Sequence, residues 1–226
     1  MKKTSLLALC LSIALMLTAC GGRQGSESEQ EQARVTVVAT TYPVYLLASA
    51  VAENVDGVVV ERLNTGAVSC LHDYTLTVSD MKLIESADVI AMNGAGLEDF
   101  MDDALAAAKG TVINCSEGVE LLELLGHDHH DEDEAEGEHY DPHFWMDPAN
   151  AAIMAENLEK GLSQADPDNQ QTYTDNLTAT LAQLESWNST LQDMFQGSGV
   201  EVSGLITFHD GFQYFAKAFD LPLLAA

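Results

Sequence analysis

Basic residues are scarce in this 226-residue sequence: nine Lys and Arg stand against 36 Asp and Glu, which gives a formal net charge of −27. A surface with this charge repels nucleic acids and anionic lipid headgroups, whereas it attracts cations. The composition therefore excludes a nucleic-acid partner and favours a cationic one. The apolar content, 46% of the residues, is ordinary for a globular protein.

Cysteine is scarce as well, with four residues, of which Cys10 and Cys20 lie close to the N-terminus. Cys70 and Cys115 remain for the folded part of the chain. In a compartment that permits disulfides, these two could form a bridge. Two buried free thiols are the alternative, and a metal-binding role for either cysteine is a third.

Long apolar runs are missing too. Leu6–Leu17 is apolar but too short to span a bilayer as a mature helix, and two lysines precede it, as in a secretory signal. The run ends in Leu-Thr-Ala-Cys-Gly, which resembles a bacterial lipoprotein signal; a plain secretory peptide is the alternative. We expect residues 1–19 to be removed and Cys20 to be lipidated. Acyl chains would then hold the protein at the extracytoplasmic cell surface.

The first half of the mature chain predicts an α/β lobe. Residues 20–34 contain almost no apolar side chain and indicate a flexible tether. In residues 35–146, short β-branched runs alternate with amphipathic segments. The expected strands are 34–39, 57–63, 88–92 and 111–114, and the expected helices are 43–55, a segment with Ser79 as its N-cap, and 97–108. This alternation predicts a parallel sheet that is covered on both faces.

Residues 147–196 predict helices that start at two Asp-Pro pairs, because an acidic N-cap followed by proline favours a helix start. After the second pair, apolar residues recur every three or four positions. This spacing predicts one helix of about 28 residues, roughly 42 Å long. We expect its apolar stripe, which includes Trp187 and Met194, to pack in the core, and the rigid helix to join two lobes.

Residues 197–226 predict the beginning of a second α/β lobe. Strand-like segments at 202–208 and 221–226 flank a helical segment at 211–219. Because the sequence stops directly after an apolar strand, with no polar tail, we interpret this second lobe as incomplete. The predicted fold class is therefore α/β, with two parallel-sheet lobes joined by a long helix.

The seven histidines suggest a metal site, since imidazole and carboxylate are the ligands of zinc. Four of them lie in an acidic loop at residues 126–140, namely His127, His129, His130 and His139. His143 follows this loop where the sequence turns apolar. His72 and His209 follow strand-like segments, and ligands of open parallel sheets bind outside the carboxyl ends of the strands. A lone loop histidine without a function is the alternative for each.

Three stretches closely resemble the solute-binding lipoproteins of ABC importers for zinc and manganese. They are HDYTLTVSDM from His72, DPHFWMDPANA from Asp141 and GLITFHDGFQYFAKAFDLP from Gly204. The resemblance covers residues 35–226 and implies two α/β lobes with a metal ion in the cleft between them. It also implies the ligands His72, His143 and His209, a monomer, and an ABC permease as the partner.

The resemblance favours Zn²⁺ as the cargo. Manganese members place a carboxylate where this chain has His209, and manganese prefers more oxygen ligands than three imidazoles provide. The chain departs from the pattern before His72, where Cys70-Leu71 stands in place of the usual acidic residue. A carboxylate that some relatives use as a fourth ligand would lie beyond Ala226. Water, a loop histidine or that absent acid remain alternatives for the fourth ligand.

Further acidic and histidine residues are candidates for supporting roles. Asp73, Asp141 and Asp210 each lie close to a proposed ligand and could orient its imidazole, although capping or solvation is the alternative. The loop 126–140 could be a solvated run, or it could also collect zinc weakly.

The sequence therefore predicts a zinc-binding receptor that captures Zn²⁺ and delivers it to an ABC permease without performing chemistry. Protonation of the imidazoles below about pH 6 is expected to weaken metal binding. A zinc-dependent hydrolytic enzyme is one alternative, but the sequence contains no HExxH motif. A metal-binding adhesin or buffer without a transport role is the other.

Overall fold

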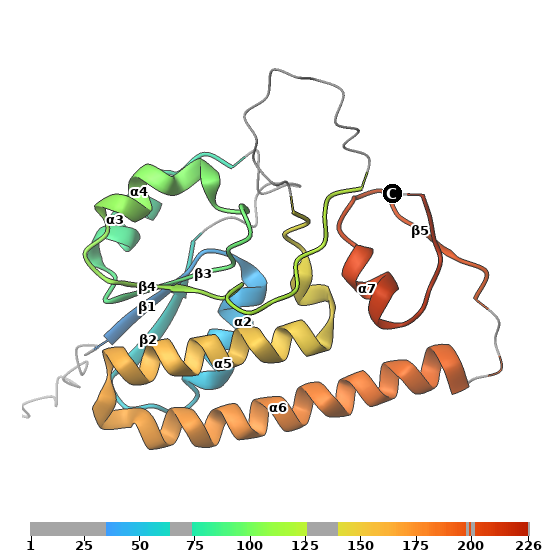
Figure 1. Ribbon diagram of the computed structural model, residues 1–226. Coiled ribbons are helices and arrows are strands. Elements are labelled where there is room, and N and C mark those ends of the chain that lie inside the picture. Colours follow the sequence, from blue (N-terminus) through green and yellow to red (C-terminus); the bar gives the residue numbers. More distant parts are fainter. Residues whose placement is uncertain (1–34, 64–73, 126–139, 198, 200–201, 226) are drawn as a thin grey trace, which may run out of the picture. The chain divides into compact units, whose positions relative to one another are not determined.

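A four-stranded parallel sheet forms the centre of the first half of the computed structural model (Figure 1). The structure describes residues 35–63, 74–125, 140–197, 199 and 202–225. The strands are β1 (Val35–Ala39), β2 (Val58–Arg62), β3 (Val89–Met92) and β4 (Thr111–Asn114), and their order in the sheet is β2-β1-β3-β4. The central strands β1 and β3 are buried almost throughout. Strands covered on both faces carry continuous apolar runs, which is why the sequence revealed them.

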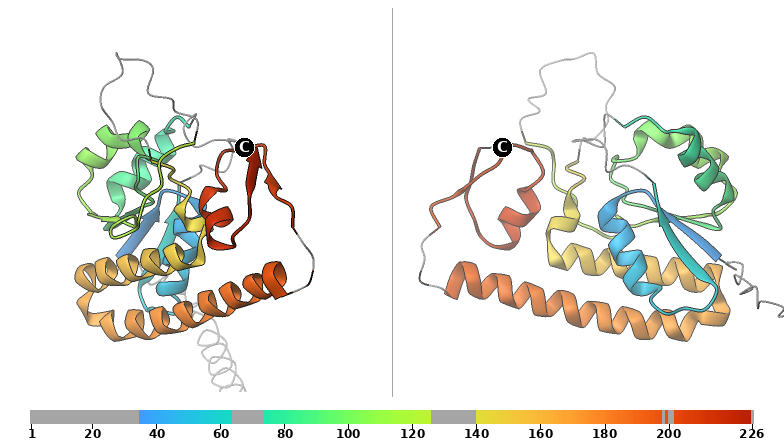
Figure 2. Two further views of the ribbon diagram at one scale, coloured as in Figure 1. Left: turned by 45° about the vertical axis from the view of Figure 1, so that its right-hand side comes forward. Right: turned by 180° about the vertical axis from the view of Figure 1, so that it is seen from behind.

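Helices cover both faces of this sheet (Figures 1 and 2). On one face, Val37 and Val89 pack in a cluster with α2 (Tyr42–Val51) and α5 (Pro148–Ala165). On the other face, Val38 and Ile90 pack with α3 (Val78–Ser86) and α4 (Asp102–Ala107), which a 3-10 turn (Asp99–Met101) precedes. Neighbouring strand residues point to opposite faces, so the two clusters share the same strands.

The helix starts follow capping chemistry. Asp147 caps α5, because its Oδ1 accepts a hydrogen bond from Ala149 N at 2.8 Å, and proline follows it in the first turn. The N-cap of α3 is Thr77 rather than the predicted Ser79. Thr77 and Asp80 form a capping box, and this reciprocal pair satisfies two backbone N–H groups, which Ser79 could not do.

The long helix α6 (Gln170–Gln192) is shorter than predicted. A 3-10 turn (Pro167–Asn169) precedes it, and a π-helical turn (Asp193–Gly197) follows it. It packs against α5 and α2. The expectation that its whole apolar stripe is buried is wrong: Trp187 is 57% exposed and Met194 is 59% exposed. Because α5 has 18 residues and α6 has 23, the C-terminal part of α6 extends past its main packing partner.

The last described segment contains a second pair of parallel strands. β5 (Leu205–Ile206) pairs with β6 (Leu223–Ala225), and α7 (Gln213–Ala218) connects them. This strand-helix-strand unit agrees with the predicted α/β class. The predicted strand at 202–208 is reduced to two residues. Among the helices in the described part of the chain, none has both the length and the apolar character that crossing a bilayer requires.

Candidate metal centre

His143 lies on a short segment that backbone and side-chain hydrogen bonds fix on both sides. Tyr140 forms an antiparallel bridge with Glu123, and Asp141 N donates to Leu122 O at 2.8 Å. Directly after His143, the buried Phe144 begins a 3-10 turn (Phe144–Met146) that leads into α5. The position of the imidazole is therefore set by its neighbours rather than by a free loop.

The orientation of the His143 ring is set by Asp141. The buried Asp141 Oδ1 accepts a hydrogen bond from His143 N at 2.9 Å and lies 2.7 Å from His143 Nδ1. Since a carboxylate can only accept, Nδ1 carries the proton and donates it. The lone pair of Nε2 then faces away from Asp141, which is the arrangement of a metal-binding imidazole.

His209 follows β5 in a tight turn. Its carbonyl oxygen accepts hydrogen bonds from Thr207 Oγ1 at 3.0 Å and from Gly211 N at 2.9 Å. The turn brings His209 Nε2 to 3.0 Å from His143 Nε2, with the two rings nearly perpendicular. The side chain of His143 is 13% exposed, whereas His209 lies on the exposed side of the pair.

Gly211 provides the space for this pair. A Cβ atom at position 211 would lie 2.9 Å from Cδ2 of His209 and 3.0 Å from Cδ2 of His143. Both distances are shorter than a normal carbon–carbon contact of about 3.5 Å or more. A side chain at this position would therefore push the two imidazoles apart.

A buried carboxylate supports the His143 segment from the sheet edge. Glu98 accepts hydrogen bonds from Thr40 Oγ1 at 2.6 Å, Asn93 N at 2.7 Å and Gly94 N at 2.9 Å. Burial raises the pKa of Glu98 above its usual value, while these three donors act in the opposite direction. Asn93 Nδ2 in turn donates to Pro142 O at 3.0 Å. This network was not predicted from the sequence, although Asn93-Gly94 directly after a buried strand was a visible signal.

The separation of the two Nε2 atoms suits a shared metal ion. Two Zn–N bonds of about 2.0–2.1 Å at a tetrahedral angle hold their nitrogen atoms roughly 3.3 Å apart. The observed 3.0 Å is close to this value. Within the described residues, no three His, Cys, Asp or Glu side chains gather in a way that could hold a metal ion. A complete site at this pair therefore requires at least one more ligand.

Several predicted site residues lie outside the described residues. They are Cys20, Cys70, His72, Asp73, His127, His129, His130 and His139. Of the described residues, Asp210 forms no hydrogen bond with His209, in contrast to the Asp141–His143 pair. Cys115 is a free and fully buried thiol, and burial raises its pKa. The alternative of a bridge to Cys70 involves a residue outside the described part of the chain.

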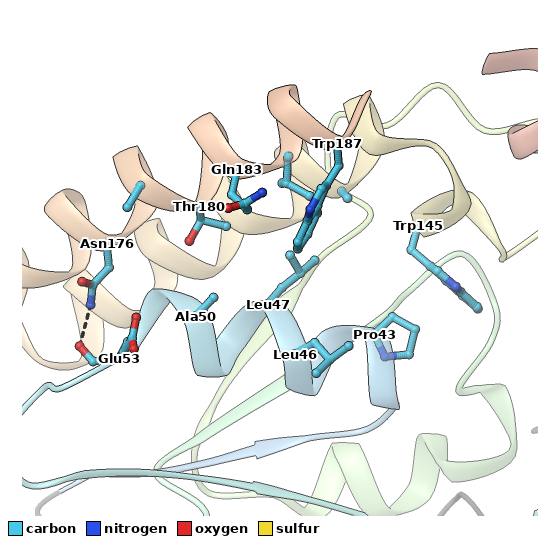
Figure 3. A pocket seen from close by; sticks show the side chains of 13 residues that line it. Pro43, Leu46, Leu47, Ala50, Glu53, Trp145, Asn176, Thr180, Gln183 and Trp187 are labelled. Carbon is cyan, nitrogen blue, oxygen red and sulfur yellow. Dashed lines mark hydrogen bonds between the residues drawn. The ribbon is translucent and has the colours of Figure 1, made fainter. Parts of the chain in front are cut away.

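An apolar cavity of about 600 Å³ lies between α2 and α6, and neither His143 nor His209 lines it (Figure 3). Figure 3 shows Leu46, Leu47 and Trp187 directed toward it from the two helices. Its lining contains Glu53 but no histidine or cysteine among the described residues, so its chemistry does not suit a transition-metal ion.

The parallel-sheet lobe, the long helix and the facing imidazoles together suit a protein that binds a metal ion. Residues 37–226 match the family described as zinc-uptake complex component A, periplasmic, and the chain belongs to this family. The family consists of substrate-binding proteins for transport, not of enzymes. Substrate-binding proteins of ABC importers partner with a permease. This chain, like the lipoproteins it is similar to, is extracytoplasmic and lipid-anchored.

Similar proteins and solved structures align with most of this chain. The metal ABC transporter substrate-binding lipoprotein SloC of Streptococcus mutans is 31% identical over 231 residues, covering 98% of this chain and 70% of SloC. A crystal structure of ZnuA superposes with a TM-score of 0.73 at 26% identity, covering 84% of this chain and 69% of that one. A Zn(II)-bound variant of AdcAII from Streptococcus pneumoniae superposes with a TM-score of 0.71 at 28% identity, covering 84% and 68%.

Proposed function

We propose that the cargo of this receptor is Zn²⁺, that His72, His143 and His209 bind it, and that the chain delivers it to its permease. The observation that carries this proposal is the 3.0 Å separation of the Nε2 atoms of His143 and His209. The pair has four ring nitrogens. Of these, only His143 Nδ1 faces a carboxylate of the described residues, that of Asp141. Asp141 would thus keep His143 in the tautomer that presents a lone pair to the ion.

The choice of zinc rests on ligand chemistry. The relatives include proteins named for manganese, such as PsaA of Streptococcus mitis, and for iron, such as MtsA of Streptococcus pyogenes. Manganese favours carboxylate and water oxygen, whereas imidazole nitrogen suits zinc. A site with three imidazoles therefore supports zinc over manganese. Iron accepts imidazole as well, so a direct competition between metals is required.

The remaining acidic and histidine residues would have supporting roles. The acidic loop would hold additional zinc weakly through His127, His129, His130 and His139, and the strongly negative surface would draw cations toward the protein. Asp73 would orient His72 as Asp141 orients His143. Lipidation at Cys20 would keep the receptor beside its permease.

Competition titration tests the proposal. The full chain and its variants His72→Ala, His143→Ala and His209→Ala are titrated with zinc, manganese and ferrous iron against a chromophoric chelator. We expect one tight zinc equivalent, weaker binding of the other two metals, and a loss of zinc affinity of at least about tenfold, or 1.4 kcal/mol, in each variant. A His127→Ala variant is the control and should retain the tight equivalent. Tight zinc binding that survives all three substitutions would refute the proposal.

A further inference from the structure

A tyrosine hydroxyl connects the segment that carries His209 to the segment that carries His143. Tyr214, in the first turn of α7, is buried. Its hydroxyl donates a hydrogen bond to Asp141 O at 3.0 Å and accepts one from Leu122 N at 2.8 Å. These partners are 73 and 92 residues away along the chain, so both hydrogen bonds depend on the tertiary fold.

The two partners of Tyr214 belong to one structural unit. Asp141 N donates to Leu122 O, and Glu123 bridges Tyr140, so the two backbone segments are paired at this point. Gln213, next to Tyr214, adds a hydrogen bond from its Nε2 to Glu123 O at 3.0 Å. The start of α7 is therefore held against this pair of segments by two neighbouring side chains.

The same unit is connected to both imidazoles, to His143 directly and to His209 through the start of α7. Asp141 uses its backbone carbonyl for Tyr214 and its carboxylate for His143. His209 lies five positions before Tyr214, and Gly211 makes the close turn between them. A shift of α7 away from Asp141 would carry His209 away from His143. The Tyr214 ring also packs edge-on against Phe144, a contact that phenylalanine would keep at this position.

The geometry points to Tyr214 as a positioning residue of the metal site, whose hydroxyl sets the distance between His143 and His209. Tyr214 is not a ligand, because its hydroxyl is already bonded to Asp141 O and Leu122 N. The inference rests on the proposed function, since it assigns the two histidines to one ion. It adds a residue that acts on affinity without touching the metal.

The test compares two matched tyrosine variants. Tyr214→Phe removes only the hydroxyl. The control Tyr173→Phe removes the hydroxyl of another buried tyrosine, whose partner Asp166 lies at the end of α5. We expect Tyr214→Phe to lower zinc affinity about tenfold, mainly through faster dissociation, with a melting temperature close to that of Tyr173→Phe. The control should bind zinc as the unaltered chain does.

A double-mutant cycle with His209→Ala separates positioning from a general structural effect. If Tyr214 acts by placing His209, then Tyr214→Phe should weaken zinc binding less than about twofold in the His209→Ala background, because coupled residues give non-additive losses. Equal losses in both backgrounds would overturn the inference. Should Tyr214→Phe fail to fold, Gln213→Ala, which removes the neighbouring hydrogen bond, replaces it in the same cycle with the same two outcomes.

The outcomes also distinguish this inference from the proposed function. If His209→Ala lowers zinc affinity and Tyr214→Phe does not, only the positioning role is wrong. If His209→Ala leaves zinc affinity unchanged, the proposed function fails, and the positioning role fails with it.

Discussion

The side chain of Asn93 donates a hydrogen bond from Nδ2 to the carbonyl oxygen of Pro142 at 3.0 Å, across 49 residues of sequence. Asn93 follows β3 and is fully buried, and Pro142 directly precedes His143. This contact links the carboxyl edge of the parallel sheet to the segment that carries one imidazole. The histidine pair proposed to bind the metal is thus attached to the sheet through a neutral amide.

Replacing this amide should affect both stability and metal binding. Asn93→Ala leaves Pro142 O without its donor, and we expect a loss of about 1–3 kcal/mol in the free energy of unfolding. Zinc affinity should fall as well, because the His143 segment loses a support. Asn157→Ala is the matched control, since Asn157 Nδ2 donates to Cys115 O and Glu117 O on the side of α5. Urea unfolding and zinc titration of both variants check this. A similar loss of zinc affinity in the control would contradict a specific role for Asn93.

Glu98 should make stability depend on pH. Burial raises the pKa of Glu98 in the folded protein above its ordinary value of 4.5, so the unfolded chain loses this proton at lower pH than the folded one does. The contribution of this raised pKa to stability is fully present below pH 4.5 and is lost as the pH rises through the folded-state pKa. Glutamine at position 98 cannot titrate, so the Glu98→Gln variant should not lose stability in this way as the pH rises.

Urea unfolding between pH 4.5 and pH 8 measures the effect. The free energy of unfolding of Glu98→Gln, relative to that of the unaltered chain, should increase with pH. The substitution also alters the hydrogen bond from Gly94 N, but this shifts the difference by a constant amount and leaves its trend with pH unchanged. The exposed Glu53→Gln serves as the control and should show no such trend. A pH-independent difference between Glu98→Gln and the unaltered chain would show that the raised pKa is wrong.

Gly211→Ala should reduce zinc affinity by at least about tenfold, equivalent to 1.4 kcal/mol. The added Cβ would lie within about 3 Å of both imidazole rings and would force them apart. Gly197→Ala is the control, because a Cβ at Gly197 meets only Asp193 at an ordinary distance of 3.9 Å. Unchanged zinc affinity in Gly211→Ala would mean that the rings do not need to lie as close as the structure places them.

Cys115 should be unreactive toward iodoacetamide in the folded protein. Its side chain is fully buried, and burial raises its pKa, so almost no thiolate forms near neutral pH. Unfolding without reductant should expose a thiol that alkylates at once. If mass spectrometry shows that alkylation also requires a reductant, Cys115 is oxidised. A disulfide bridge to Cys70 is then the simplest explanation.

Much of the fold could be predicted from local patterns. The strands β1 and β3 are buried on both faces and therefore carry continuous β-branched runs, and Asp147-Pro148 marks the start of α5 by capping chemistry. Details that depend on competition between neighbours were missed. Thr77 replaces Ser79 as the N-cap because Asp80 completes a capping box with it. The burial of α6 was overestimated because periodicity does not reveal how far its packing partners extend.

The candidate site was harder to predict from local sequence patterns than the fold was. The meeting of His143 with His209 was inferred from motif resemblance, since no spacing rule brings together residues 66 positions apart. Glu98 and Tyr214 were not identified, because each acts through hydrogen bonds to backbone groups that only the tertiary fold supplies. In the sequence they are an ordinary acidic residue and an ordinary aromatic residue.

X-ray absorption spectroscopy of the zinc-loaded chain tests most directly whether His143 and His209 share one ion. With one zinc equivalent bound, we expect imidazole ligands at about 2.0–2.1 Å. The spectrum of His209→Ala should show one imidazole fewer, and that of His143→Ala likewise. An unchanged imidazole shell in the His143→Ala/His209→Ala double variant would contradict the account.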